Sequence, residues 1–293
     1  MQEQEGTKPA KRENPILGAI KGALISIGAM LPGISGGALC VILGIYKPMM
    51  ELLSNPIKYI KKHFMFFLPI GIGFLVGALV TSKLLGGFLE ANETAAIFLF
   101  VGLIAGTMPS LLKEARQEGV ARGSYAALGI AMVAMLLWMV PMAMGGQAAI
   151  EPNILWWCLC GVLWGLGIIV PGMSPSNIFF FLGLAGPMYA AIGNLNMGVI
   201  LPMGLCLLAT VLLLSNGVGY CLKRWYSLFM HAVIGIVIAS TLVILPPVKL
   251  LLEPGYTFAM GATDILVYVG CFAVGVLCAW LLGRIQKPEE KAA

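Results

Sequence analysis

Long apolar stretches, separated by short polar segments, occupy most of the chain. Six of them cover about residues 64–86, 95–112, 124–144, 198–221, 227–246 and 264–283. Each has a length that crosses a hydrocarbon core of about 30 Å as one helix. Two further stretches, at about 16–46 and 154–186, are interrupted near their centres by proline and glycine, which do not hold a regular helix. The pattern predicts an all-α polytopic membrane protein.

The first interruption reads Pro32-Gly33-Ile34-Ser35-Gly36-Gly37. Non-helical backbone cannot face lipid, because each unpaired N–H or C=O group in hydrocarbon costs several kcal/mol. The arms beside it, Ile16–Met30 and Ala38–Tyr46, would rise about 22 Å and about 14 Å, so neither spans a core of about 30 Å. We therefore expect a re-entrant hairpin that enters the membrane and returns, with its tip near the middle of the bilayer.

A second interruption, Pro171-Gly172-Met173-Ser174-Pro175-Ser176, repeats the first at an offset of 139 residues (171 − 32). The matched residues are Gly22, Gly28, Pro32, Gly33, Ser35, Leu43 and Gly44 with Gly161, Gly167, Pro171, Gly172, Ser174, Leu182 and Gly183. Beyond the hairpins the match continues at an offset of 133 (201 − 68), from Leu68 with Leu201 to Gly102 with Gly235. Paired broken spans at corresponding positions of two halves are typical of a transporter's binding site.

Each half thus holds one re-entrant hairpin and three transmembrane helices, and the odd number of crossings inverts the second half. We expect repeat 1 at about 16–145 and repeat 2 at about 154–286, within a single membrane domain of 16–293. Residues 1–15 are mostly polar and are expected to form a disordered cytosolic arm. An inverted-topology repeat of this kind would bring the two hairpin tips together from opposite sides of the membrane.

The basic residues favour the same topology. Only 11% of the residues are charged, against about 25% in soluble domains, and the mean hydropathy is +0.94. With both hairpins returning to their side of entry, 16 of the 18 Lys and Arg side chains face the cytosol and only Lys83 and Lys249 face outward (18 − 2). A hairpin that crossed instead would place Lys58, Lys61 and Lys62 outside. Both termini are therefore expected in the cytosol, and the net charge of +5 indicates membrane orientation rather than a nucleic-acid partner.

The hairpin tips carry the candidate site for an anion. A helix N-terminus offers free N–H groups and a positive dipole end, a serine hydroxyl can cap it, and glycine lets a ligand approach closely. The candidate residues are Gly33, Ser35, Gly36 and Gly37 in the first hairpin and Gly172, Ser174, Ser176 and Asn177 in the second. Uncharged donors from two tips would bind a phosphate without a permanently buried lysine. The alternative is that Ser35 and Ser174 only cap their own helices while the glycines permit tight packing.

Other polar residues are weaker candidates. Lys21, on the first arm, either extends its ammonium to the membrane interface or steers an anionic headgroup toward the tip. Asp264 is expected to be a helix-N-terminal charge facing water, and His231 an interfacial hydrogen-bonded residue, with proton transfer as its alternative. The seven cysteines lie in or beside apolar spans, where small buried side chains are expected. No metal, cofactor or catalytic residue is predicted.

Several segments resemble the PopT family of bacterial polyprenyl-phosphate translocases. They are Gly28–Gly37, Leu43–Tyr46, Gly102–Pro109 and Pro171–Ser174, and the resemblance covers nearly the whole chain between its polar ends. It implies inward return of undecaprenyl phosphate, the lipid carrier of cell-wall sugar precursors, across the bacterial cytoplasmic (inner) membrane, with the phosphate headgroup at the hairpin tips. The second motif departs from the family pattern, because Pro175 replaces a glycine and the expected Gly-x-Tyr is displaced to Gly186–Tyr189.

Two other functions fit parts of the pattern. Intramembrane undecaprenyl-pyrophosphate phosphatases resemble this chain in their inverted repeats and Pro-Gly-x-Ser motif, but there the motif continues with an arginine, where this chain has Gly36 and Pro175. Hydrolysis needs such charge neutralisation together with acid–base groups, which disfavours an enzyme. A small-anion channel or exchanger would equally use helix N-termini at the midplane. The sequence leaves open the coupling ion (proton or sodium) and a homodimer.

Overall fold

The computed structural model describes residues 14–32, 36, 39–40, 43–45, 48–49, 52, 56–145, 151–170 and 175–285. Within these ranges the regular structure is helical and no strand occurs. The helices are α1 (Pro15–Met30), α4 (Pro56–Ala91), α5 (Glu93–Ala115), α6 (Ser124–Met144), α7 (Ile154–Ile169), α8 (Ser176–Phe181), α9 (Ala185–Gly193), α10 (Met197–Ile244), α11 (Pro246–Leu252) and α12 (Ala262–Ile285).

Among the described residues, six helical segments are long and apolar enough to cross a membrane. They are His63–Ala91, Glu93–Ala115, Ser124–Met144, Met197–Ser215, Arg224–Ile244 and Ala262–Leu281. These segments overlap the six predicted crossings, so the prediction of an all-α polytopic membrane protein is confirmed. Helices α1 and α7, which lead into the two interruptions, have only 16 residues each.

Two predicted spans, 198–221 and 227–246, are joined in one helix. α10 runs for 48 residues and bends at Trp225, where φ is −134° and ψ is 39°. The stretch around Lys223 and Arg224 is polar, but it contains none of the glycine, proline, asparagine, aspartate or serine residues that favour a turn. The helix therefore continues through it with one distorted residue. α4 bends in the same way at His63, where φ is −121° and ψ is 19°.

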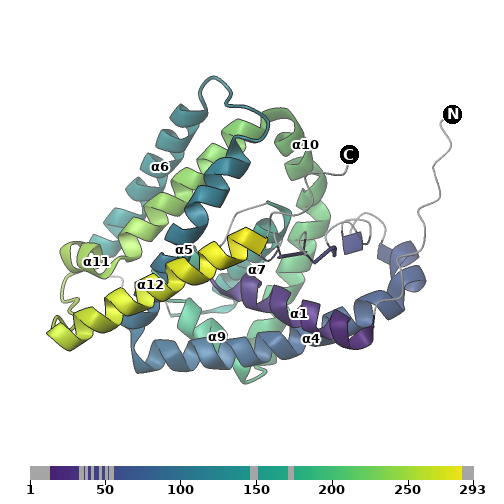
Figure 1. Cartoon of the computed structure of the whole chain (residues 1–293), viewed down its shortest axis with the longest axis horizontal. Helices are drawn as coiled ribbons and strands as arrows, with labels where there is room; N and C mark the ends of the chain where they lie inside the picture. Colours follow the sequence, from purple (N-terminus) through teal and green to yellow (C-terminus); the bar gives the residue numbers. More distant parts are fainter. Residues whose placement is uncertain are drawn as a thin grey trace.

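Helix α1 packs along α4, and the two run in the same direction (Figure 1). Gly22 of α1 lies so close to α4 that a Cβ there would overlap the carbonyl oxygen of Ile70, and further along the two helices Ser26 lies beside Gly77. Because small residues allow this approach, the backbones of α1 and α4 are in direct contact. The parallel course means that α1 enters the molecule from the end at which α4 begins.

Helix α7 packs along the first half of α10 in the same manner. A Cβ at Gly161 would overlap the carbonyl oxygen of Met203, and Gly165 lies against Thr210. These contacts occur at the sequence offsets of 139 (161 − 22) and 133 (203 − 70) from the contacts between α1 and α4.

The starts of α1 and α7 are also equivalent. The Asn14 side chain accepts from Ile16 N at 3.0 Å, and the Asn153 side chain accepts from Leu155 N at 3.0 Å. Asn14 and Asn153 are again 139 residues apart (153 − 14). Matching caps and matching helix contacts support the predicted repeat at the level of individual residues.

The remaining long helices pair across the two predicted halves. α5 packs along α12, where Gly102 lies against Phe272 and Gly106 against Ala279. α6 packs along the second half of α10, where Gly235 lies against Leu128. The later crossing helices of each half therefore have their main partners in the other half.

The largest cluster of buried apolar side chains draws on both interrupted spans. Met30 and Cys40 contribute from the first span, and Phe179 and Tyr189 contribute from the second. α9, which follows the second interruption, packs against α4. The two interrupted spans are thus parts of one core.

Candidate functional site

The residues that flank the two interruptions are hydrogen-bonded to one another. Trp164 of α7 donates through Nε1 to the carbonyl oxygen of Ala29 at 3.2 Å. Tyr189 of α9 donates through its hydroxyl to the carbonyl oxygen of Met30 at 2.8 Å. Both acceptors lie at the C-terminal end of α1, where carbonyl groups lack partners within the helix. The end of the first arm is therefore held by side chains of the second interrupted span.

Gly36 lies on the returning side of the first interruption and packs against α1. A Cβ at Gly36 would lie 3.1 Å from the Cβ of Ala29, which is closer than ordinary van der Waals contact. On the other side of α1, Ser82 of α4 donates to the sulfur of Met30 at 3.4 Å. The chain thus returns alongside α1 at the same level as the contacts with Trp164 and Tyr189.

Five of the predicted site residues lie outside the described residues: Gly33, Ser35, Gly37, Gly172 and Ser174. Ser176 and Asn177 are described, each only 2% exposed, in the first turn of α8. Pro175 occupies the N-cap position of α8 and provides no side-chain cap. The donor groups of the second hairpin that can be located are therefore inside the protein, not at its surface.

The Asn177 side chain is directed at α10. Its amide nitrogen Nδ2 donates to Ser240 Oγ at 3.4 Å and to Thr241 Oγ1 at 3.3 Å. Its Oδ1 is buried and has no hydrogen-bond partner among the described residues. The amide hydrogens therefore attach the second hairpin to α10, and the oxygen left over is an acceptor, which does not suit a phosphate oxygen.

Lys21 and two other polar residues have defined partners. The ammonium of Lys21 donates to the carbonyl oxygen of Leu43 at 2.9 Å and so ties α1 to the returning part of the first span, a contact that the sequence did not predict. His231 is fully buried, with Nδ1 2.7 Å from the carbonyl oxygen of Ser227. Asp264 Oδ2 accepts from Gly261 N at 3.1 Å in the first turn of α12, as expected for a helix-N-terminal acid.

A cavity of about 520 Å³ lies between the two predicted halves, at the end of the molecule where α4 passes into α5 and α10 ends. Its apolar lining includes Leu89, Ile97, Met142, Phe180, Phe181 and Val243. Its charged lining residues are Glu90, Glu93, Lys249 and Glu253. In the predicted topology this end faces outward, and the cavity combines apolar walls with charged side chains, as an amphipathic ligand requires.

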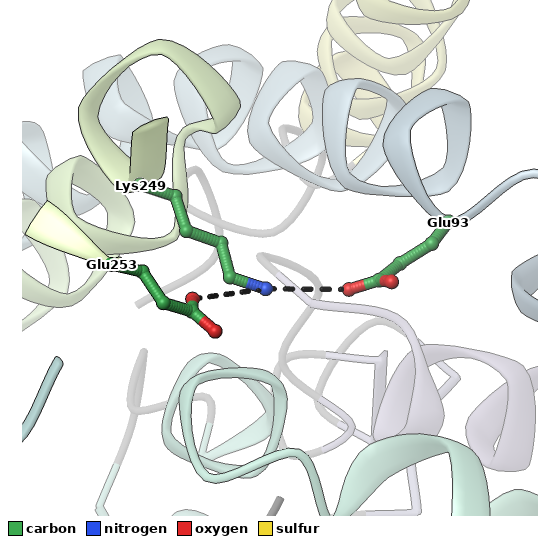
Figure 2. A network of polar contacts seen from close by, with 3 residues as sticks. All are labelled: Glu93, Lys249 and Glu253. Atoms are coloured by element: carbon green, nitrogen blue, oxygen red, sulfur yellow. Dashed lines mark ion pairs between the residues drawn. The ribbon is translucent and has the colours of Figure 1, made fainter. Parts of the chain in front are cut away.

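Lys249 lies between two carboxylates in this cavity (Figure 2). Its Nζ is 3.6 Å from Glu93 Oε1 and 3.5 Å from Glu253 Oε2, and it lies 4.4 Å from the centroid of the Tyr256 ring. Burial raises the pKa of Tyr256, and Glu93 and Glu253 raise it as well, so the phenol is neutral and presents its ring to the cation.

The sequence reasoning used Lys249 only as one of two outward-facing basic residues. The signal that could have marked it is the rarity of such residues on that side, together with Glu253 four positions later. The partner Glu93 is far away in the sequence, so its contribution depends on the packing of α5 against the C-terminal helices.

These features define a polytopic α-helical membrane protein in which two proline- and glycine-interrupted spans meet inside one core. The chain belongs to the family described as Undecaprenyl phosphate translocase-like, which it matches over residues 51–255. No solved structure matches the chain.

Two curated relatives carry the same name, Polyprenyl-phosphate transporter. The chain is 24% identical to the one from Staphylococcus aureus over 284 residues, which is 92% of this chain and 97% of the relative. It is 20% identical to the one from Vibrio cholerae serotype O1 over 242 residues, which is 75% of this chain and 74% of the relative.

Proposed function

We propose that this protein transports undecaprenyl phosphate across the bacterial cytoplasmic membrane, from the outer to the inner leaflet. The observation that carries the proposal is the contact between the two interrupted spans, where Trp164 and Tyr189 bond to the end of α1. This contact is what a transporter needs if both interruptions are to form one polar site inside the membrane. The family and the names of the two relatives support a polyprenyl phosphate as the cargo.

The proposed route separates the headgroup from the tail. A phosphate cannot cross hydrocarbon unaided, whereas the polyprenyl tail has no reason to leave it. The headgroup therefore binds at the tips, to hydroxyl and backbone N–H donors around Ser35, Gly36, Gly37 and Ser174, while the tail remains in lipid between helices. Fixed uncharged donors replace the hydration of the phosphate, so release on the other side requires no strong ion pair to break.

The repeat and its orientation are part of the same proposal. Each half contributes one re-entrant hairpin and three transmembrane helices, inverted relative to each other, with both termini in the cytosol. The parallel pairing of α1 with α4 and of α7 with the first half of α10 supports this arrangement, because each first arm then enters from the side where its partner helix begins. The Asn14 and Asn153 caps support the equivalence of the two arms.

Transport without hydrolysis is favoured over the phosphatase alternative. The phosphatases carry an arginine after the Pro-Gly-x-Ser motif, and this chain has Gly36 and Pro175 at those positions. The names of both relatives describe transporters. A small-anion channel is a separate hypothesis, which an assay of anion flux distinguishes from lipid transport.

The test is lipid movement in proteoliposomes. Replacing Ser35 and Ser174 together by alanine removes hydroxyl donors from both tips and should slow inward movement of undecaprenyl phosphate by about tenfold or more, the loss expected for hydrogen bonds to a charged group. The matched control is Ser110→Ala, at an exposed position of α5.

The same vesicles separate the three candidate functions. Phosphate release from undecaprenyl pyrophosphate would indicate the phosphatase, and chloride flux without lipid movement would indicate the channel. If the double variant folds and still moves the lipid at the wild-type rate, the tips are not the headgroup site.

A further inference from the structure

Lys249 is held in a way that leaves room for a competing ligand. Its two carboxylate contacts, at 3.5 and 3.6 Å, are longer than the 2.7–2.9 Å or so of a tight charge-assisted hydrogen bond. The side chain is 26% exposed and lines the cavity. An ammonium has three donors, so a phosphate oxygen that comes within hydrogen-bond distance can replace a carboxylate on it.

We propose that the cavity beside Lys249 is where a lipid phosphate monoester is captured from the outer leaflet, and that Glu93 and Glu253 make this capture selective against phosphodiester lipids. The proposal rests on the proposed function, because it assigns the loading step of that transport to a second site away from the hairpin tips.

The walls of the cavity suit the part of the ligand next to the phosphate. Leu89, Ile97 and Phe181 are among the apolar side chains that line it, and the charged residues stand on the same cavity. A soluble anion would use only the charged side of such a site. A lipid whose phosphate is attached directly to an isoprenoid chain would use both the ammonium and the apolar walls.

The excess of negative charge supplies the selectivity. Glu93 and Glu253 together neutralise Lys249 and leave one negative charge over, with Glu90 also on the cavity. A phosphate monoester carries about −1.5 to −2 charges at pH 7 and can displace a single carboxylate from the ammonium. A phosphodiester headgroup carries one negative charge, gains less from Lys249 and meets the same repulsion. Specificity then comes from an element that opposes the wrong ligand.

The cavity is also next to the proposed route. Its lining includes Phe180, Leu182 and Gly186, which lie between the second interruption and α9. α9 carries Tyr189, whose hydroxyl bonds to Met30 at the end of α1. A headgroup released from Lys249 therefore lies beside the segments that lead to the hairpin tips.

The experiment locates the binding of a defined probe. A farnesyl phosphate analogue with a photoreactive group at the far end of its chain is added to the purified full chain, and the labelled peptides are mapped by mass spectrometry. The wild-type protein should be labelled on the cavity walls, in the segments around Phe181 and Val243. Lys249→Gln should reduce this labelling about tenfold or more, as expected for loss of a charge-assisted hydrogen bond, and Lys83→Gln, the matched outward-facing control, should not.

The opposite sign is expected for the carboxylates. Glu93→Gln keeps the shape of the side chain but frees Lys249, so labelling by farnesyl phosphate should rise and competition by phosphatidylglycerol should become effective. A merely structural ion pair would predict that Lys249→Gln and Glu93→Gln both weaken the protein. The sign for Glu93→Gln decides the question even if Lys249→Gln fails to fold.

The outcomes separate this inference from the proposed function. If the wild-type protein moves undecaprenyl phosphate but Lys249→Gln and Glu93→Gln leave cavity labelling unchanged, the capture site is wrong and the transport proposal stands. If the wild-type protein moves no polyprenyl phosphate, the proposed function fails. Wild-type labelling confined to the hairpin segments would also overturn the capture site.

Discussion

At the scale of single residues, the contacts at the end of α1 carry the most information. A helix that ends inside a membrane protein leaves carbonyl groups that water cannot reach, so other side chains have to supply donors. Trp164 and Tyr189 do so for Ala29 and Met30. Both donors come from the second interrupted span, so their geometry reports directly on how the two spans are joined.

Tyr189→Phe should therefore lower stability and slow transport. Removing the hydroxyl leaves the buried carbonyl of Met30 without this donor, at a cost of about 1–3 kcal/mol. The change is measured as a lower midpoint of thermal unfolding in detergent and as slower lipid movement in vesicles. Tyr220→Phe is the control, because Tyr220 is 59% exposed. Equal behaviour of the two variants would show that the contact with Met30 contributes nothing.

Residue-level prediction from the sequence succeeded where backbone chemistry dominates. Proline and glycine in an apolar run identified both interruptions, because lipid tolerates no unpaired backbone. The sequence did not predict that Asn177 would bond to α10 or Lys21 to Leu43, because either side chain has several polar groups within reach and only the tertiary structure selects one.

At the scale of helices, glycine contacts decide which elements lie together. Gly22 and Gly161 each face a carbonyl oxygen of the partner helix, whereas a Cβ added at Gly71 or Gly204, on the partner helices, would meet nothing within 4 Å. The four residues form two pairs at the offsets of the predicted repeat, 139 (161 − 22) and 133 (204 − 71). They provide a matched set for testing whether the two contacts are equivalent.

Alanine at these four positions should give two opposite results. Gly22→Ala and Gly161→Ala force α1 and α7 away from their partners and should each destabilise the protein by about 1–3 kcal/mol, the usual range for overpacking. Gly71→Ala and Gly204→Ala should be neutral or stabilise by up to about 1 kcal/mol, because alanine favours the helix. Thermal unfolding of the four variants checks this. A large difference between Gly22→Ala and Gly161→Ala would contradict the equivalence of the two arms.

The pairing of helices is also where sequence reasoning ended. Six crossing helices follow from hydrophobic length, because the bilayer imposes it. The partner of each helix does not, since small residues occur on most of the spans and permit close contact without selecting a partner. The pairing of α5 with α12, and the continuous course of α10 through Trp225, depend on packing that appears only in three dimensions.

At the scale of the whole molecule, the two predicted halves are interlocked. α5 of the first half packs on α12 of the second, and α6 of the first half packs on α10 of the second. Rocking one sequence half against the other would have to break both of these interfaces. We therefore expect the moving bodies to be groups of packed helices drawn from both halves.

A cross-link between α6 and α10 should leave transport intact. The hydroxyl oxygens of Ser124 and Ser227 are 2.9 Å apart and buried, so cysteines at both positions, in a background without the native cysteines, should form a disulfide. A protease site in the segment between α6 and α7 then shows the bond as fragments that separate only after reduction. Lipid movement should be the same before and after reduction, with Ser124→Cys alone as the control. Arrest by oxidation and recovery on reduction would mean that α6 and α10 slide during the cycle.

The interlocked pairing has a consequence for how such a chain could have arisen. If the two halves descend from one duplicated gene, a product of half the present length would have left the faces of its later crossing helices uncovered. Such an ancestor needed a second copy inserted upside down to cover them, so an antiparallel dimer would have preceded the fusion that made the present single chain.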